Sequence, residues 1–288
     1  MRRLVAALLV GTCALMASSC SSDKSSSSPT TTTNTAPTNN ATTTTKPKLA
    51  NGDKYVALGS SIASGFGISV QSTDCGRSSR DYPQLVSKHY GLALTDVTCG
   101  AATVADVVDT PQGAHPPQIQ AVTPDAKLVT VTVGGNDIGY NATALACGDP
   151  ATACHAPPTL ASSLATDRTA LVSMVEKIHA AAPKATVVFV TYPREVPEGN
   201  CAALSYTDAD ASVVRSMGQQ LEDAFVSVVK PADVVFVDPY VVPGDHTACA
   251  AANERWTAGK IPEDGFAYHP TALGHAVMAK MVQDALGN

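Results

Sequence analysis

Short apolar runs alternate along the chain with longer segments in which apolar residues recur at helical spacing. Most of the runs are rich in valine, which favours buried strands, and they lie at 54–58, 93–97, 127–133, 185–191 and 233–237. The amphipathic segments predict helices at 80–90, 161–182, 208–229 and 270–286. The first of these helices has Asp81 as a candidate N-cap and Pro83 in its first turn, as helix starts commonly do.

This alternation predicts an α/β domain in which a parallel sheet is covered on both faces, a three-layer α/β/α arrangement. Right-handed crossovers leave few topologies, and we expect five strands in the flavodoxin-like order 2-1-3-4-5. Ser61, Gly100 and Asn136 follow the first three strands, which are neighbours in that order. All three residues should therefore lie at the carboxyl edge of the sheet, where such folds place their sites.

Residues 1–20 have the organisation of a secretory signal. Arg2 and Arg3 precede an apolar stretch, and small residues separate that stretch from Cys20. The stretch is shorter than the ~20 residues that a membrane helix needs. The residues before Cys20 resemble a bacterial lipobox, although Ala17 stands where leucine is usual. We expect Cys20 to be diacylated, which would anchor the exported protein to the outer face of a membrane; cleavage and full secretion is the alternative.

Residues 21–50 are nearly all Ser, Thr, Asn and Pro, so they cannot bury apolar surface and predict a disordered spacer. The folded part then spans 51–288, a length that suits one domain. The chain carries a formal net charge of −6 and no basic patch, which argues against nucleic acid as a partner. The folded part has no coiled-coil pattern or obvious interface segment, so we expect a monomer.

Six cysteines fall in the folded part, and an even number in an exported protein predicts disulfides. Six cysteines allow 15 pairings; we favour the local one, Cys75–Cys99, Cys147–Cys154 and Cys201–Cys249. A zinc site is the alternative, but the sequence lacks the Cys-x-x-Cys spacing and clustered histidines that such sites use. We expect no metal and no organic cofactor.

Three separated segments carry side chains suited to acyl transfer. Ser61 follows the first strand, Gly-Gly-Asn-Asp occupies 134–137, and His269 precedes Pro270, which fits the first turn of the last helix. A serine hydroxyl needs a base to take its proton, and histidine can serve as that base and later as the acid for the leaving group. The amide of Asn136 can donate to an oxyanion. Each segment alone is common, but the ordered set predicts a serine hydrolase.

These segments resemble the SGNH (GDSL-type) hydrolase family, in particular its secreted, disulfide-containing lipase and esterase branch. The resemblance covers residues 54–286 and rests on four blocks, at 59–61, 99–103, 134–139 and 269–271. It implies a nucleophile at Ser61, a base at His269, oxyanion donors from the amide of Asn136 and the backbone N–H of Ser61, and three sequential disulfides.

Three positions depart from the family pattern. Ser60 stands where aspartate is usual, which can alter the support of the loop. Ala101 stands where a glycine normally offers its N–H, so that donor can come from Gly100 or from Ala101. Phe266 stands where an aspartate usually orients the histidine three residues later.

The missing acid has two physical solutions. The ring Nδ1–H of His269 can donate to a main-chain carbonyl such as that of Phe266, which makes a Ser–His dyad of the kind some members of this branch use. Alternatively, Asp264 can reach the imidazole from two residues further back. We favour the carbonyl. Without a charged orienter the imidazolium is stabilised less, so activity should be modest.

We therefore expect an exported serine esterase or lipase that hydrolyses carboxylic esters of lipids, small molecules or glycans through an acyl-enzyme at Ser61. One alternative is a carbohydrate O-deacetylase that acts on cell-surface glycans; a polar, open cleft would favour it, and an apolar groove would favour a lipase. The alternative from another class is a non-catalytic binding protein on the same fold, motivated by the departures at Ser60, Ala101 and Phe266.

Overall fold

The computed structural model of the protein describes residues 48–71 and 74–287. The predicted signal at 1–20, the predicted lipidation of Cys20 and the predicted spacer, apart from residues 48–50, lie outside the described residues. Within the described part, no helix is both long enough and apolar enough to cross a membrane.

One parallel sheet of five strands, in the order β2-β1-β3-β4-β5, forms the centre of the domain. This confirms the predicted α/β class and the predicted strand order. β1 pairs with β2 on one side and with β3 on the other, so the ends of these three strands are neighbours. The strands are β1 (Lys54–Gly59), β2 (Ala93–Asp96), β3 (Leu128–Thr132), β4 (Thr186–Val190) and β5 (Val235–Val237).

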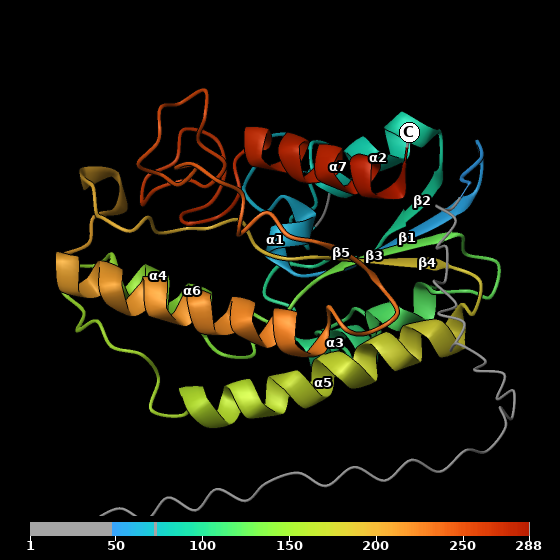
Figure 1. Cartoon of the computed structure of the whole chain (residues 1–288), viewed down its shortest axis with the longest axis horizontal. Helices are drawn as coiled ribbons and strands as arrows, with labels where there is room; N and C mark the ends of the chain where they lie inside the picture. The colour runs from blue at the N-terminus through green and yellow to red at the C-terminus, as the bar shows by residue number, and fades with distance from the viewer. Residues whose placement is uncertain (1–47, 72–73, 288) are drawn as a thin grey trace, which may run out of the picture. The chain divides into compact units, whose positions relative to one another are not determined.

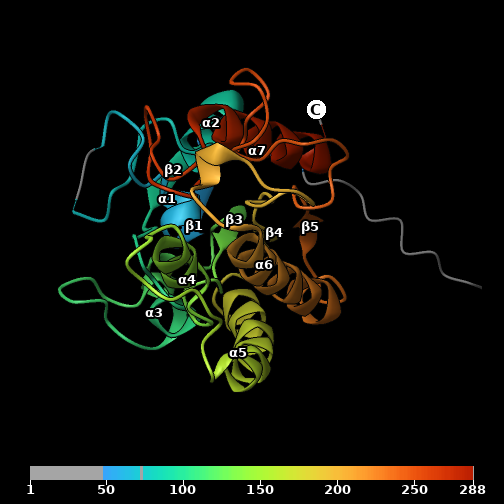
Figure 2. The ribbon, with the colours of Figure 1, turned by 90° about the vertical axis from the view of Figure 1, so that its left-hand side faces the viewer.

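Helices cover both faces of the sheet, which gives the three expected layers (Figures 1 and 2). α2 (Tyr82–Tyr90) and α7 (Ala272–Leu286) pack against each other on one face. α5 (Leu160–Ala181) packs against α6 (Asp208–Val228) on the other face. β1 and β3 are buried over nearly their whole length, because apolar side chains from both helical layers meet them there.

Side-chain caps explain where the long helices begin. The carboxylate of Asp81 accepts the N–H of Gln84 at 2.8 Å and caps α2, with Pro83 in the first turn as predicted. The prediction for the last helix is wrong by two residues, because Thr271 is the cap of α7 and its hydroxyl accepts the N–H of Gly274. Pro270 lies outside the helix and forms an isolated bridge with Thr257.

Among the described residues, five short helical segments follow strands or loops and were not predicted. Each is too short to show a clear apolar period, which is the signal that identified the long helices. They are α1 (Ser61–Ser64), α3 (Val104–Val108), α4 (Tyr140–Cys147) and the 3₁₀ turns η1 (Gln118–Ala121) and η2 (Ala202–Leu204).

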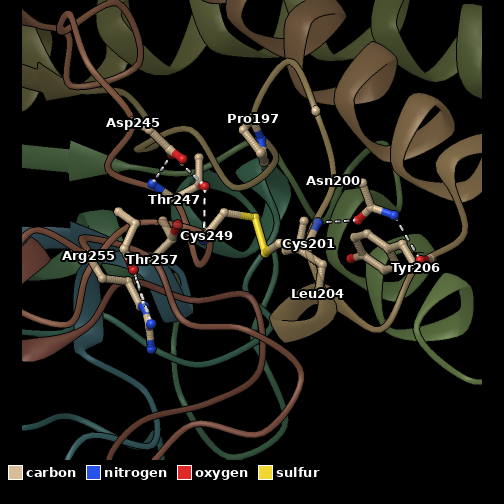
Figure 3. Close-up of a disulfide and its surroundings, with 12 residues drawn as sticks. Pro197, Asn200, Cys201, Leu204, Tyr206, Asp245, Thr247, Cys249, Arg255 and Thr257 are labelled. Atoms are coloured by element: carbon tan, nitrogen blue, oxygen red, sulfur yellow. Dashed lines mark hydrogen bonds between the residues drawn. A yellow bond between two sulfur atoms is a disulfide. The ribbon is translucent and has the colours of Figure 1, made fainter.

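In the part of the chain that the structure describes, three disulfides join the six cysteines in the pairs expected from the sequence, Cys75–Cys99, Cys147–Cys154 and Cys201–Cys249. Cys201–Cys249 ties the segment before α6 to the long loop that precedes α7, beside the hydrogen bonds between Thr247 and Asp245 (Figure 3). Cys75–Cys99 joins the loop that contains Cys75 to the segment just after β2. The bridges therefore restrain loops at the carboxyl edge, which the sheet itself does not hold.

Candidate active site

Ser61 is placed by a sharp turn at the end of β1. Gly59 ends the strand with φ +135°, and a Cβ atom there would lie 2.3 Å from the carbonyl oxygen of Thr132 on β3. The N–H of Ser60 donates to that same carbonyl at 3.0 Å. Ser61 then begins α1, and its side chain lies at the carboxyl edge of the sheet with only 8 % of the residue exposed. The fold thus presents one serine hydroxyl just beyond the strand.

His269 comes from the loop before α7 and faces this hydroxyl. Its Nε2 lies 2.8 Å from Oγ of Ser61, and its Nδ1 lies 2.9 Å from the carbonyl oxygen of Ala267. The preceding residue, Tyr268, has φ +61°, so the backbone takes a left-handed turn immediately before the histidine. With Nδ1–H donating to the carbonyl, Nε2 is free to accept the serine proton.

Burial keeps this imidazole neutral. Loss of solvent lowers the pKa of His269 to about 4, against the smaller opposing effect of the Ala267 carbonyl. His275, one turn into α7, is also buried, and its pKa is lowered to about 3; its Nδ1 accepts the N–H of Tyr82 at 3.1 Å. At neutral pH the ring of His269 is therefore in the form that can accept a proton.

Neither group that was expected to orient His269 contacts its Nδ1. Asp264 accepts hydrogen bonds from Ser69 and from the guanidinium of Arg80, the latter at 2.9 Å. The carbonyl of Phe266 accepts the main-chain N–H of His269 in a turn, so it does not meet the ring. A main-chain carbonyl does face Nδ1, as favoured from the sequence, but it belongs to Ala267, one residue later than predicted.

The loop after β3 carries Asn136 and Asp137, and both side chains hydrogen-bond to the main chain of the segment after β2. The side-chain amide of Asn136 donates to the carbonyl of Ala102 at 2.9 Å, which leaves its second N–H for another acceptor. The carboxylate of Asp137 accepts the N–H of Val104 at 3.1 Å, and burial raises the pKa of this group to about 6. These contacts fasten the loop after β3 to the loop after β2.

The choice between Gly100 and Ala101 can be made from their hydrogen bonds. The N–H of Gly100 already donates to the carbonyl of Cys75 at 3.0 Å. The N–H of Ala101 has no acceptor among the described residues. Ala101 also has φ +64°, a conformation that costs energy for a residue with a side chain and that often marks a functional loop. The geometry therefore favours Ala101 as the donor.

A pocket of about 360 Å³ joins these groups. Aromatic and aliphatic side chains dominate its wall, and the rings of Phe66 and Phe266 meet edge to face with centroids 5.2 Å apart. Asp264 instead lines a separate cavity of about 450 Å³ beside Arg80 and Lys260. The smaller pocket is lined by Ser61, Phe66, Gly100, Ala101, Asn136, Asn141, Ala142, Leu145, Phe266 and His269.

Two groups at the site were not predicted. The carbonyl of Ala267 is a main-chain group, and no side-chain pattern can reveal which carbonyl will face an imidazole. Asn141 lies in the first turn of α4, and its Nδ2 is 3.2 Å from both ring nitrogens of His269. The only sequence signal for it is its position five residues after Asn136.

Metal ligation has one geometric candidate among the described residues. The sulfurs of Cys75 and Cys99 and a ring nitrogen of His115 lie within 4.8 Å of one another. The two sulfurs are bonded to each other as a disulfide, so they cannot act as thiolate ligands. This cluster is therefore structural.

A buried serine hydroxyl bonded to a neutral imidazole, beside free amide donors at the carboxyl edge of a parallel sheet, defines a serine hydrolase of the three-layer α/β/α class. Residues 57–277 match the model of the GDSL-like Lipase/Acylhydrolase family, and the chain belongs to that family. This confirms the resemblance inferred from the four sequence blocks.

Similar proteins agree with this assignment. Lipase 2 of Streptomyces coelicolor is 31 % identical over 252 residues, which cover 81 % of this chain and 85 % of the relative. A lipase of Streptomyces rimosus is 27 % identical and covers 77 % of this chain and 82 % of its own length. The crystal structure of an extracellular lipase from Streptomyces rimosus superposes with a TM-score of 0.66 and 25 % identity, over 81 % of this chain and all of that one.

The protein is therefore a carboxylic-ester hydrolase of the esterase and lipase type, and its substrate is an ester. The predicted class, an esterase or lipase, is confirmed. The alternative of a non-catalytic binding protein is not supported. The disulfides and the likeness to an extracellular lipase indicate an exported protein.

Replacing Gly59 with alanine should displace the turn that carries Ser61. The new Cβ would overlap the Thr132 carbonyl, and φ +135° is unfavourable for alanine. We expect the free energy of unfolding to fall by about 3 kcal/mol or more, with a loss of ester hydrolysis. Urea unfolding and an ester assay measure the two effects. Gly199→Ala is the matched control, because nothing lies within 4 Å of its Cβ; equal stability and activity of the two variants would disprove the close approach.

The pH dependence of catalysis should reflect the burial of His269. If His269 is the general base, its neutral imidazole is the active form. Because burial lowers the pKa of this ring to about 4, kcat/KM should then stay level as pH falls from 7 and decline only near pH 4. A pH profile on a soluble ester tests this, with aliquots returned to pH 7 to exclude acid inactivation. An acidic limb centred near 6.5, the ordinary value for histidine, would mean that the ring is solvated.

Proposed function

We propose that Ser61 is the nucleophile and His269 the general base of an ester hydrolase that works through an acyl-enzyme. The observation that carries this proposal is the 2.8 Å contact between Ser61 Oγ and His269 Nε2, with the Ala267 carbonyl on the other ring nitrogen. This contact supplies the activated nucleophile that acyl transfer requires.

In the acylation step, Oγ of Ser61 attacks the carbonyl carbon of the ester while its proton passes to Nε2 of His269. The bond between that carbon and the alcohol oxygen then breaks, and the leaving alcohol takes the proton from Nε2. In the second step, water gives a proton to Nε2 and attacks the acyl carbon. The serine leaves with that proton, and the carboxylic acid is released.

Three donors are suited to stabilise the negative charge that develops on the carbonyl oxygen. They are the N–H of Ser61 at the start of α1, the N–H of Ala101 and the second N–H of the Asn136 amide. One preorganised donor of this kind contributes about 3–4 kcal/mol to the transition state. We assign the main-chain donor of the second block to Ala101, since the N–H of Gly100 is already occupied.

The histidine works in a dyad in which Ala267 provides the orienting group. Its carbonyl fixes the tautomer with the proton on Nδ1, as an aspartate would, but it carries no negative charge. The imidazolium formed during catalysis is therefore less stabilised than in a charged triad. This supports a modest rate of ester hydrolysis. Another polar group near the ring could stabilise the imidazolium further.

The walls of the pocket favour an ester with an apolar acyl group. Phe66, Phe266, Ala142 and Leu145 line it, and such side chains bind hydrocarbon rather than sugar hydroxyls. The apolar lining was the feature expected to separate a lipase or esterase from a carbohydrate O-deacetylase, and it supports the former.

Hydrolysis of p-nitrophenyl esters from acetate to palmitate tests the proposal. Ser61→Ala should abolish turnover, and Asn136→Ala should lower kcat by about 10²–10³-fold. Ser60→Ala is the control for the neighbouring hydroxyl, which makes no contact with His269, and it should retain activity. Undiminished turnover by Ser61→Ala would show that Ser61 is not the nucleophile. A strict preference for the acetate ester would favour a carbohydrate O-deacetylase instead.

We also propose that the domain at 51–288 works as a monomer on the outer face of the cell membrane. A diacyl group on Cys20 would anchor it after removal of the signal at 1–20, and the polar segment at 21–50 would serve as a tether. The small residues before Cys20 support lipidation.

Lipidation is tested by expressing the full chain and Cys20→Ser in a bacterium fed radiolabelled palmitate. The wild-type protein should take up label and sediment with membranes, whereas the variant should do neither. Release of unlabelled wild-type protein into the medium would instead favour ordinary cleavage and secretion.

A further inference from the structure

Asn141 lies over the face of the His269 ring. Its Nδ2 is 3.2 Å from Nδ1 and 3.2 Å from Nε2. An atom this close to both nitrogens cannot lie in the ring plane, because it would overlap Cε1 between them. The two in-plane directions are in any case taken by Ala267 and Ser61. The amide therefore contacts the π face of the imidazole, where an N–H group is favourable while the ring is neutral.

The oxygen of the same amide is not anchored. Oδ1 of Asn141 is buried and has no hydrogen-bond partner among the described residues. A buried carbonyl oxygen without a donor is unusual and calls for an explanation. The two ends of an asparagine amide have nearly the same shape, so half a turn about its last side-chain bond would exchange Nδ2 and Oδ1 over the ring without repacking the pocket.

We propose that Asn141 is a positioning residue that responds to the charge of His269. Its amide presents Nδ2 to the neutral ring and turns to present Oδ1 when the ring has taken the proton of Ser61. This inference rests on the proposed function, in which His269 is the general base.

This exchange matters because a neutral carbonyl, and not a carboxylate, orients His269, so the charged ring has no negatively charged partner there. A positive ring attracts the negative end of the amide dipole, and the attraction is strong in a pocket of low dielectric constant. Oδ1 has no partner in the resting state, so it gains an interaction only when His269 is charged. An interaction made only in the charged state lowers the barrier rather than tightening substrate binding. Asn141 would thus do part of the work of an aspartate.

The acidic groups nearest in sequence to the site residues are bonded to other partners and do not contact the His269 ring. His275 on α7 is the titratable neighbour whose pKa is affected by the charge of His269. Asp264, on the same loop as the histidine, is paired with Arg80, and Asp137 accepts the N–H of Val104. Among the described residues, Asn141 is thus the side chain other than Ser61 that makes a polar contact with the ring.

Two substitutions and two measurements test the proposal. Asn141→Leu keeps the bulk of the side chain without its dipole, and kcat should fall about tenfold or more while KM changes little. Asn141→Asp places a negative charge over the ring and should move the acidic limb of kcat/KM upward by about one pH unit or more. Titration of the His269 ring by NMR should show the same upward shift without any substrate.

Leu145→Ala is the matched control, because Leu145 lies on α4 and lines the same pocket but makes no polar contact with the ring. It should change KM and leave the acidic limb in place. Circular dichroism confirms that each variant is folded. Wild-type kcat in Asn141→Leu, or an unchanged His269 titration in Asn141→Asp, would overturn the proposal.

The proposal can fail separately from the proposed function. If a phosphonate ester does not label Ser61 in the wild-type protein, the nucleophile assignment fails, whereas the NMR titration still reports whether Asn141 senses the charge of His269. If Ser61 is labelled and the Asn141 variants titrate as wild type, only the role of Asn141 is lost.

Discussion

The hydrogen bond between Ser61 and His269 depends on the order of three strands. The serine follows the first strand and the histidine precedes the last helix, so they lie 208 positions apart along the chain. They meet because β1 lies between β2 and β3, and because α7 packs against α2 on one face of the sheet. Parallel strands end at one edge, which brings the loops after β1, β2 and β3 together there. The site therefore depends on the pairing of β1, β2 and β3 and on the packing of α7.

In the mechanism that we propose, catalysis relies on burial and dipoles more than on charge. His269 is almost fully buried, so its pKa is lowered and it accepts a proton without first having to lose one. A main-chain carbonyl contacts its Nδ1, and the donors that we propose for the oxyanion are amides. Such groups are held by the backbone and need little reorganisation, which is the main requirement of electrostatic stabilisation in an enzyme. The cost is a less stabilised imidazolium.

A disulfide and several hydrogen bonds hold the loops that carry these amide groups. Cys75–Cys99 restrains the chain two residues before Ala101, which has φ +64°. The carboxylate of Asp137 ties the loop after β3 to the start of α3, so the amide of Asn136 keeps its direction. The hydroxyl of Tyr192, beyond β4, accepts the N–H of Gly135 at 3.0 Å and fixes the same loop from behind. Neighbouring strands thereby position donors that the loops alone would not hold.

The sequence by itself determined the α/β class and the long helices through their apolar period, and its ordered motifs identified Ser61, Asn136 and His269 as candidates. The strand order was expected as a common topology and the cysteine pairs as the local pairing, and the structure confirms both. The sequence did not determine that Ala267 rather than Phe266 faces the imidazole, that Asp264 pairs with Arg80, or that Asn141 lies over the ring. These contacts depend on the path of a turn and on the packing of elements far apart in the chain. Only the tertiary structure decides them, since no residue pattern specifies which way a carbonyl or an amide will point.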